Sequence, residues 1–137
     1  MISIAMDNIV TADGSAVTVL RVLGEVDVGT APLLEEKIAK ALDGGVPRLV
    51  IDLARVDFCD ASGLRVLMSA RKRCLERHGW IRLVGGRRIR RLLEVTDLLE
   101  ALPCHHDLSH AMAAGQTTAP APGGSASVTS IRPIEER

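Results

Sequence analysis

The chain has 137 residues, which is enough for one ordinary domain with a hydrophobic core. Hydrophobic residues make up 47% of it and charged residues 25%, and both values are usual for a globular protein. Its 17 basic and 17 acidic residues cancel, and one Phe, one Trp and no Tyr give bases nothing to stack on, so the composition argues against nucleic acid as a partner.

The sequence also favours a particular compartment. No apolar run is long enough to span a membrane, and the opening Met-Ile-Ser-Ile-Ala-Met-Asp lacks the basic and then apolar order of a secretion signal. The three cysteines are scattered and odd in number, which fits a reducing compartment better than a disulfide framework. We therefore expect a cytoplasmic protein without a membrane partner.

The first predicted elements are two strands, at residues 2–10 and 16–23, joined by the turn pair Asp13-Gly14. Residues 24–27 are expected to leave the second strand and lead into a helix. That helix has Thr30 as its expected N-cap and continues to the next pair of glycines. Its buried stripe should consist of the apolar residues at helical spacing: Ala31, Leu34, Ile38, Ala41 and Leu42.

A strand, a short loop and a helix follow. The nearly continuous apolar run Leu49–Leu53 is typical of a central strand covered on both faces. After the loop the apolar period becomes helical, with Leu64, Leu67, Met68, Cys74 and Leu75 on the face expected to be buried. The opposite, exposed face should carry Arg65, Ser69, Lys72 and Glu76. In the loop, Asp60 and Ser62 are residue types that satisfy free amides at a helix start, which puts Ser62 in the first turn, on the face of Arg65 and Ser69.

The remaining elements are shorter. A strand is predicted at 80–84, a helix at about 87–95, a turn at 98–102 and a last helix capped by Asp107. Strands that alternate with helices indicate an α/β layered fold, with antiparallel pairing in the opening hairpin. From residue 115 the chain becomes rich in Ala, Gly, Pro, Ser and Thr, so we expect a domain at 1–114 and a disordered tail at 115–137.

The residues around Ser62 resemble a family signature. The run Val-Ile-Asp-Leu…Val-Asp-Phe-Cys-Asp-Ala-Ser-Gly-Leu, at 50–64, resembles that of STAS domains, and in particular of the small anti-sigma factor antagonists. The resemblance includes Leu23–Asp27, Thr30-Ala31 and Arg91–Thr96, and it covers about residues 17–102. It implies a mixed β-sheet of four to five strands with about four helices packed against it. It also implies a binding protein without enzymatic activity, cofactor or metal.

The resemblance further implies a phosphorylation switch. In that family the serine immediately before the glycine accepts the phosphate, and here this serine is Ser62. The implied partner-binding residues are Asp27, Asp60, Ala61, Ser62, Gly63, Arg65 and Ser69. The implied partners are an anti-sigma factor of the ATP-binding serine kinase type, from which a sigma factor is released, and a serine phosphatase. Two residues depart from the family pattern: Ala61 stands where many members have another serine, and Asp97 where a glycine often follows the Val-Thr pair.

Other functions stay open. Helix capping alone also explains Asp60 and Ser62, and a STAS module of a transporter or another multi-protein regulatory assembly would carry the same signature. A receiver domain that uses Asp52 as its phosphoacceptor is disfavoured, because the chain has no lysine after Lys72. A serine hydrolase is disfavoured because no Gly-x-Ser-x-Gly surrounds Ser62.

Two further clusters invite functional interpretations. The strongest local charge comes from Arg87, Arg88, Arg90 and Arg91, joined by Arg82. A solvated helix face is the preferred explanation and an acidic protein partner the next. Cys104, His105, His106 and His110 are metal-ligating types, but without Cys-x-x-Cys or His-Glu-x-x-His we favour surface histidines. Cys59 and Cys74 are expected to behave as small apolar residues, and a Cys74–Cys104 bridge would need Cα atoms within roughly 7 Å.

Overall fold

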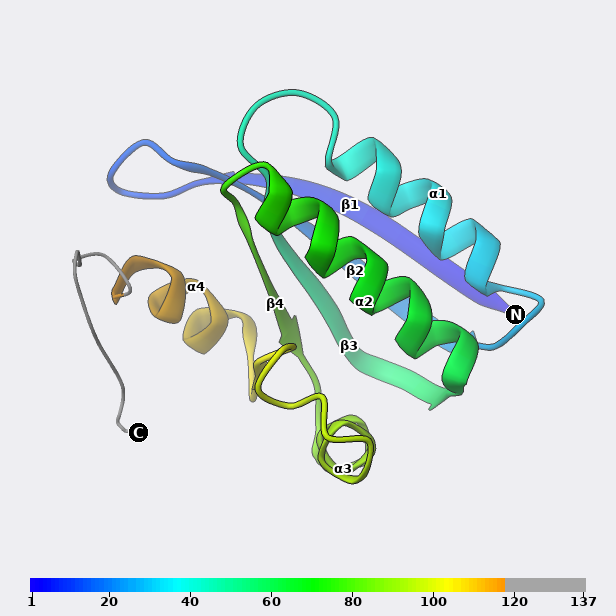
Figure 1. Cartoon of the computed structure of the whole chain (residues 1–137). Helices are drawn as coiled ribbons and strands as arrows, with labels where there is room; N and C mark the ends of the chain where they lie inside the picture. The colour runs from blue at the N-terminus through cyan, green and yellow to red at the C-terminus, as the bar shows by residue number, and fades with distance from the viewer. Residues whose placement is uncertain (118–137) are drawn as a thin grey trace.

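One five-stranded sheet organises the chain (Figure 1). The computed structural model describes residues 1–117, and of residues 115–117 only the backbone. Its strands are β1 (Ile2–Val10), β2 (Ala16–Val26), β3 (Arg48–Cys59), β4 (Trp80–Val84) and β5 (Cys104–His105). Its helices are α1 (Ala31–Ala41), α2 (Ala61–Glu76), α3 (Arg87–Val95) and α4 (Leu108–Thr117). β1 runs antiparallel to β2 and all later neighbours are parallel, in the order β1-β2-β3-β4-β5, which confirms the predicted mixed sheet with its helices.

The second strand is longer than its sequence predicts. Residues 24–27 were expected to leave it, and this was wrong, because β2 continues to Val26. Gly24 makes the continuation possible: it adopts a φ of 106°, and a Cβ at this position would collide with the carbonyl oxygen of Met1. That carbonyl accepts a hydrogen bond from the backbone N–H of Glu25 (3.1 Å), and the pairing of β2 with β3 shifts register here.

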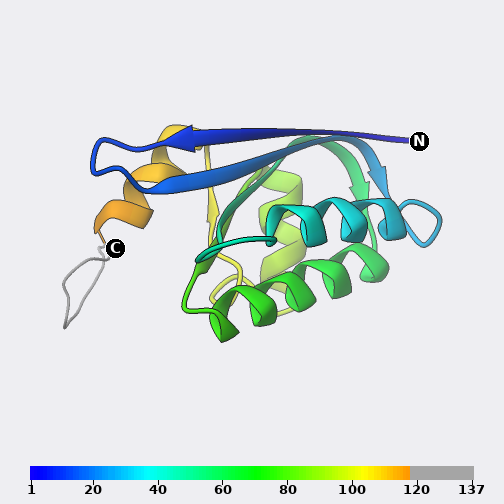
Figure 2. The same cartoon turned by 90° about the horizontal axis from the view of Figure 1, so that it is seen from above.

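The helices cover the sheet on both faces. Figure 2 shows α1 and α2 side by side on one face, where a large core cluster includes Leu20, Leu34, Ile38, Ile51 and Leu67. A smaller cluster lies on the other face, under α4, and consists of Val17, Val19, Val50, Val84 and Ala111. The middle of β3 contributes to both clusters, as its continuous apolar run predicts for a central strand.

The buried face of α2 is turned slightly from the predicted one. Its buried residues are Gly63, Val66, Leu67, Ala70 and Cys74. Leu64 and Met68 are partly buried against the core, whereas the prediction for Leu75 was wrong, because its side chain is 47% exposed. Leu75 lies in the last turn, about 100° around the axis from Cys74, which faces the core. The predicted exposed face is confirmed, since Arg65, Ser69, Lys72 and Glu76 are all exposed.

One strand near the end of the described chain was not predicted. β5 has only two residues, which is too short to show a period, and it pairs with β4 in parallel. Backbone hydrogen bonds from Leu83 to Pro103 (2.8 Å) and from Gly85 to His105 (3.0 Å) hold it in place. The predicted cap of the last helix is confirmed, because the Asp107 carboxylate accepts a hydrogen bond from the backbone N–H of His110 (2.9 Å).

The last helix extends past the predicted domain boundary at residue 114. α4 ends at Thr117, so it includes the first three residues of the predicted tail, 115–117. The rest of the predicted disordered tail, residues 118–137, lies outside the described residues. Within residues 1–117 every helix is too short or too polar to span a bilayer.

Candidate functional site

The start of α2 is built around Asp60. Its backbone is extended, and its carboxylate oxygen Oδ1 accepts hydrogen bonds from the backbone N–H groups of Ser62 (2.8 Å) and Gly63 (3.3 Å). The N–H of Asp60 donates to the carbonyl of Val26 (3.1 Å), which ties the β3–α2 loop to the end of β2. The capping role predicted for Asp60 is therefore confirmed, and Ser62 is the second residue of the helix.

The hydroxyl of Ser62 is not used in this cap. Asp60 alone satisfies the two amides, and within residues 1–117 the Ser62 hydroxyl makes no hydrogen bond. Ser62 instead lines a groove of about 410 Å³ between the starts of α1 and α2. Arg65 and Ser69 lie in the same wall, as their helical spacing predicts, and Glu35 faces them from α1. A half-buried serine with a free hydroxyl thus stands beside one cation and one anion.

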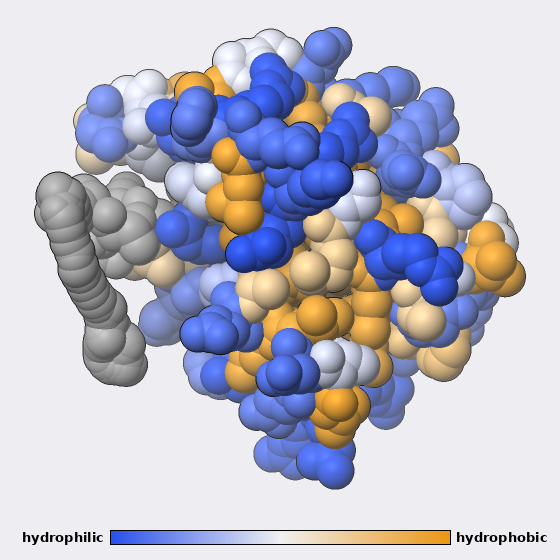
Figure 3. Space-filling model, viewed as in Figure 1, coloured by the Kyte–Doolittle hydropathy of each residue, from blue (hydrophilic) through white to orange (hydrophobic). Residues whose placement is uncertain are grey.

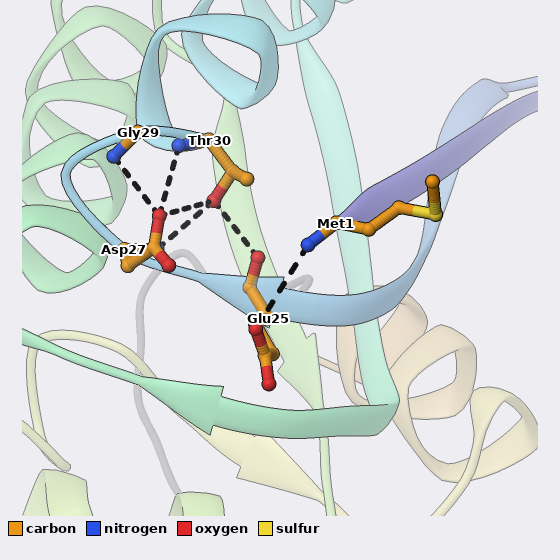
Figure 4. Close-up of polar contacts among 5 residues, drawn as sticks. All are labelled: Met1, Glu25, Asp27, Gly29 and Thr30. Atoms are coloured by element: carbon orange, nitrogen blue, oxygen red, sulfur yellow. Dashed lines mark hydrogen bonds and ion pairs between the residues drawn. The ribbon is translucent and has the colours of Figure 1, made fainter.

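The adjacent β2–α1 loop is shaped by Asp27 (Figure 4). Its Oδ1 accepts hydrogen bonds from the N–H groups of Gly29 (2.9 Å) and Thr30 (3.0 Å). These bonds, with that from Thr30 the stronger influence, hold the pKa of Asp27 below its usual value. Thr30 occupies the N-cap position of α1, but its side chain does not cap the helix. Its hydroxyl donates to the carbonyl of Glu25 (2.8 Å) and accepts from the N–H of Asp27 (2.9 Å).

The structure divides the predicted site residues into two groups. Ser62, Arg65 and Ser69 line the groove, and Ala61 is exposed beside it. Asp27 and Asp60 form the loops behind it, while Gly63 is buried in the packing below. A Cβ on Gly63 would lie 2.6 Å from Cys59 Sγ and 2.7 Å from Val26 Cγ1, so a larger residue does not fit there.

Sequence reasoning missed the α1 wall of the groove. Besides Glu35 this wall contains Val28, Ala31 and Pro32. The prediction for α1 considered only its buried stripe, whereas Val28 lies before the helix and is 77% exposed. No local pattern marks this wall, because a single exposed apolar residue such as Val28 is common on protein surfaces.

The cysteine and histidine residues do not converge on a site. In the described part of the chain, no three His, Cys, Asp or Glu side chains are grouped as metal ligands would be. His106 and His110 are exposed, as predicted, and His110 bonds to Asp107 (2.7 Å). His105 is different, because it is partly buried, and burial lowers its pKa to about 4. All three cysteines are free thiols, and burial raises the pKa of Cys59 and Cys74 to about 11, so both stay protonated at neutral pH.

The prediction that Arg82 joins the arginine cluster of α3 was wrong. Arg82 is only 7% exposed and lies on the α4 face of the sheet, with its guanidinium 3.8 Å from the centre of the Trp80 ring. Successive side chains of a strand point to opposite faces. Ile81 and Leu83 belong to the core cluster that contains Ile89 and Leu93 of α3, so Arg82, which lies between them, points away from α3. Arg88 and Arg90 donate hydrogen bonds to the carbonyls of Asp57 (3.1 Å) and Cys104 (2.8 Å).

Comparison with known proteins agrees with this arrangement. The family model of the STAS domain matches residues 8–111. BtrV of Bordetella bronchiseptica, named as a candidate anti-sigma factor antagonist, is 30% identical over 118 residues, which are 85% of this chain and 97% of BtrV. The anti-sigma-F factor antagonist RsfB of Mycobacterium tuberculosis is 41% identical over 59 residues, 43% of this chain and 48% of RsfB.

Solved structures show the same fold. The crystal structure of an anti-sigma factor antagonist from Mycobacterium paratuberculosis has a TM-score of 0.71 at 33% identity, over 85% of this chain and 95% of that one. The unphosphorylated anti-sigma factor antagonist SpoIIAA has a TM-score of 0.61 at 17% identity, over 86% of this chain and 100% of its own, and this likeness concerns the fold alone.

Proposed function

This chain belongs to the STAS domain family, and from that membership we propose that it is an anti-sigma factor antagonist. It binds an anti-sigma factor of the ATP-binding serine kinase type and so releases a sigma factor. The partner phosphorylates Ser62, which ends the binding, and a serine phosphatase restores it. The chain itself is not an enzyme. BtrV and the Mycobacterium paratuberculosis protein support this proposal, since each is at least 30% identical over most of both chains.

The proposed phosphorylation switch rests on one observation, the free hydroxyl of Ser62. Capping was the competing explanation for this serine, and Asp60 already caps the helix through two hydrogen bonds. Ser62 is therefore available for modification without loss of the cap. Its position in the groove lets a partner that touches both α1 and α2 reach it.

Phosphorylation would change the electrostatics of the groove. A phosphate on Ser62 adds about 1.5 to 2 negative charges at neutral pH. The backbone amides of Ser62 and Gly63 are already held by Asp60, and Ser62 lines the groove, so a phosphate on this residue would face the groove. Glu35 would repel it and Arg65 would attract it. A partner bound there would have to desolvate a dianion, which costs binding energy at the interface rather than stability of the domain.

The test is the affinity of Ser62 variants for the partner, once affinity capture and mass spectrometry have identified that partner. Ser62→Ala should bind it but accept no phosphate, whereas Ser62→Asp should bind it more weakly, with an unchanged circular dichroism spectrum. Ser109→Ala is the matched control, since it removes an exposed hydroxyl from the second residue of another helix, α4, outside the groove, and should still be phosphorylated. Equal affinity of Ser62→Asp, phosphorylated protein and wild type would refute the switch.

The alternative, a STAS module of a transporter or another regulatory assembly, would give a different result in the same capture. A sulfate transporter family protein from Wolinella succinogenes shares the fold, with a TM-score of 0.62 at 19% identity. Such a likeness concerns the fold and not the activity. A transporter subunit as the captured partner, without a kinase-like protein, would favour this alternative.

A further inference from the structure

A second groove lies at the end of β3, before the β3–α2 loop. It has a volume of about 350 Å³ and runs between the last residues of β3 and the helix α3. Two apolar side chains stand at its surface: Phe58 is 52% exposed and Val95 is 67% exposed. The half-buried Leu92 lines the same groove. Figure 3 shows hydrophobic residues that reach the surface below α2, toward α3. The groove is separate from the one that contains Ser62.

The edge of β3 is open beside this groove. β3 pairs with β4 only through Arg48–Asp52, although it continues to Cys59. In the described chain its later residues pair with β2 alone, so the opposite edge faces α3 instead of a strand. Arg88 donates a hydrogen bond to the carbonyl of Asp57 (3.1 Å) on this edge. An open strand edge beside an apolar groove suits a peptide in an extended conformation.

The charge around the groove is positive. Its lining includes Arg88 and Arg91 and one carboxylate, Asp57. α3 carries four arginines in all and a single acidic residue, Glu94, and its arginine Arg87 lies outside the groove lining. Guanidinium groups form paired hydrogen bonds with carboxylates, which favours an acidic ligand.

We propose that this groove binds an extended acidic segment of a partner protein. An apolar side chain of that segment packs against Phe58, Leu92 and Val95, and its carboxylates face Arg88 and Arg91. The single phenylalanine of the chain is half-exposed here, and aromatic side chains next to arginines are the usual anchors of protein interfaces. A nucleic acid would also match the arginines, but the 17 basic and 17 acidic residues of the chain cancel and provide no general attraction for a polyanion. Binding in this groove does not depend on the phosphorylation of Ser62.

Two synthetic peptides test the proposal on the full chain. The acidic probe is Gly-Glu-Glu-Ile-Phe-Glu-Glu-Gly, and the neutral probe has Gln in place of each Glu. Nuclear magnetic resonance of the labelled protein should show shifts at Phe58, Leu92 and Val95 with the acidic probe and much weaker ones with the neutral probe. Calorimetry should show that Arg91→Gln weakens the acidic probe by about threefold, as expected for one exposed ion pair. Phe58→Ser should weaken both probes.

The matched control is Arg87→Gln, which makes the same charge change on the same helix outside the groove and should leave the affinity within about 1.5-fold. Ser62→Ala should also bind the acidic probe like wild type, so the result is independent of the proposed switch. Equal binding of both probes, absence of shifts at the groove, or shifts at Ser62 and Arg65 would overturn the proposal.

The other possible occupants give distinct results that would overturn it too. If a chain cut after Thr117 binds the probe and the full chain does not, the segment 118–137 occupies the groove. Shifts at Phe58 that grow with protein concentration in the absence of probe would identify a second copy of the chain. Shifts at the same residues with a 12-nucleotide single-stranded DNA, and none with the acidic peptide, would identify a nucleic acid.

Discussion

Two aspartates in neighbouring loops accept the backbone hydrogen bonds of those loops, and the hydroxyl of Ser62 is not needed for them. Asp60 holds the first amides of α2, and Asp27 holds those of Gly29 and Thr30 in the β2–α1 loop. Neither carboxylate faces the groove, because each is turned toward its own backbone. The polar side chains that line the groove are therefore Ser62, Arg65, Ser69 and Glu35.

Removal of the Asp60 cap should cost stability. We expect Asp60→Ala to lower the free energy of unfolding by about 1 kcal/mol, because two amides at the start of α2 lose their acceptor. Asp60→Asn should retain most of the wild-type free energy of unfolding, since an amide oxygen also caps helices. Urea denaturation measures the difference. Asp57→Ala is the control, as it removes an exposed carboxylate three residues earlier. An equal loss in both alanine variants would mean that charge, and not the cap, is responsible.

The absence of a side chain at Gly63 should also contribute to the stability of the domain. We expect Gly63→Ala to lower the free energy of unfolding by about 1–3 kcal/mol, because the new Cβ would press on Cys59 Sγ and Val26 Cγ1. The double variant Gly63→Ala/Cys59→Ala should recover part of this loss, because it removes one of the two colliding atoms. Gly45→Ala is the control, with open space around its Cβ. No recovery in the double variant would show that the collision with Cys59 Sγ is not the cause of the loss.

His105 should make stability depend on pH. Burial, followed by the charge of Arg82, lowers its pKa to about 4 from an ordinary value of 6.5. The folded state therefore binds fewer protons than the unfolded state between these values, and stability falls as the pH falls from about 6.5 to about 4. Urea midpoints across this range should fall less for His105→Gln than for wild type. His106→Gln, an exposed neighbour, should keep the wild-type slope, and identical slopes for all three proteins would contradict this account.

At the scale of the elements, parallel strands explain where the site lies. β2 and β3 run in parallel, so the loops that follow them leave the sheet at the same end. The hydrogen bond from Asp60 N–H to the carbonyl of Val26 joins these two loops directly. The groove of Ser62 is therefore a consequence of two strand–loop–helix units placed side by side (Figure 1).

The elements with long, regular patterns were predictable from the sequence. The apolar stripe of α1, the run Leu49–Leu53 in β3 and the cap residue Asp60 each carry a local physical signal. Features that depend on tertiary contacts were not predictable. β5 exists only because β4 offers it backbone partners, and the end of β2 depends on the close approach of Met1 to Gly24.

The candidate site was predictable to a similar extent. Helical spacing alone placed Ser62, Arg65 and Ser69 on one face of α2, and all three line the groove. The opposite wall comes from α1, about thirty residues away in the chain, and no local pattern relates the two helices. The direction of Arg82 depends on which face of the sheet α4 covers, and this is also a property of the assembled fold.

At the scale of the whole molecule, the two faces of the sheet differ in how much they bury. The face of α1 and α2 has the large core cluster, whereas within residues 1–117 α4 is the one helix that packs on Val17, Val19, Val50 and Val84 on the other face. The stability of the second face therefore depends on one helix of ten residues.

Two truncations test this dependence. A chain that ends after Asp107 lacks α4, and we expect its free energy of unfolding to fall by about 2–4 kcal/mol as the four valines become accessible to water. A chain that ends after Thr117 keeps α4 and should unfold like the full chain, because residues 118–137 contain few apolar side chains. Urea denaturation followed by circular dichroism measures both. A large loss on removal of 118–137 would show that this segment belongs to the core.

The stacking of Arg82 on Trp80 has a spectroscopic consequence. The chain has one tryptophan and no tyrosine, so its intrinsic fluorescence above 300 nm comes from Trp80, on the α4 face of the sheet. The emission therefore reports the environment under α4, whereas the far-ultraviolet signal averages over every helix and strand. If α4 opens before the sheet unfolds, the fluorescence transition will precede the circular dichroism transition, and if the domain is one cooperative unit the two will coincide.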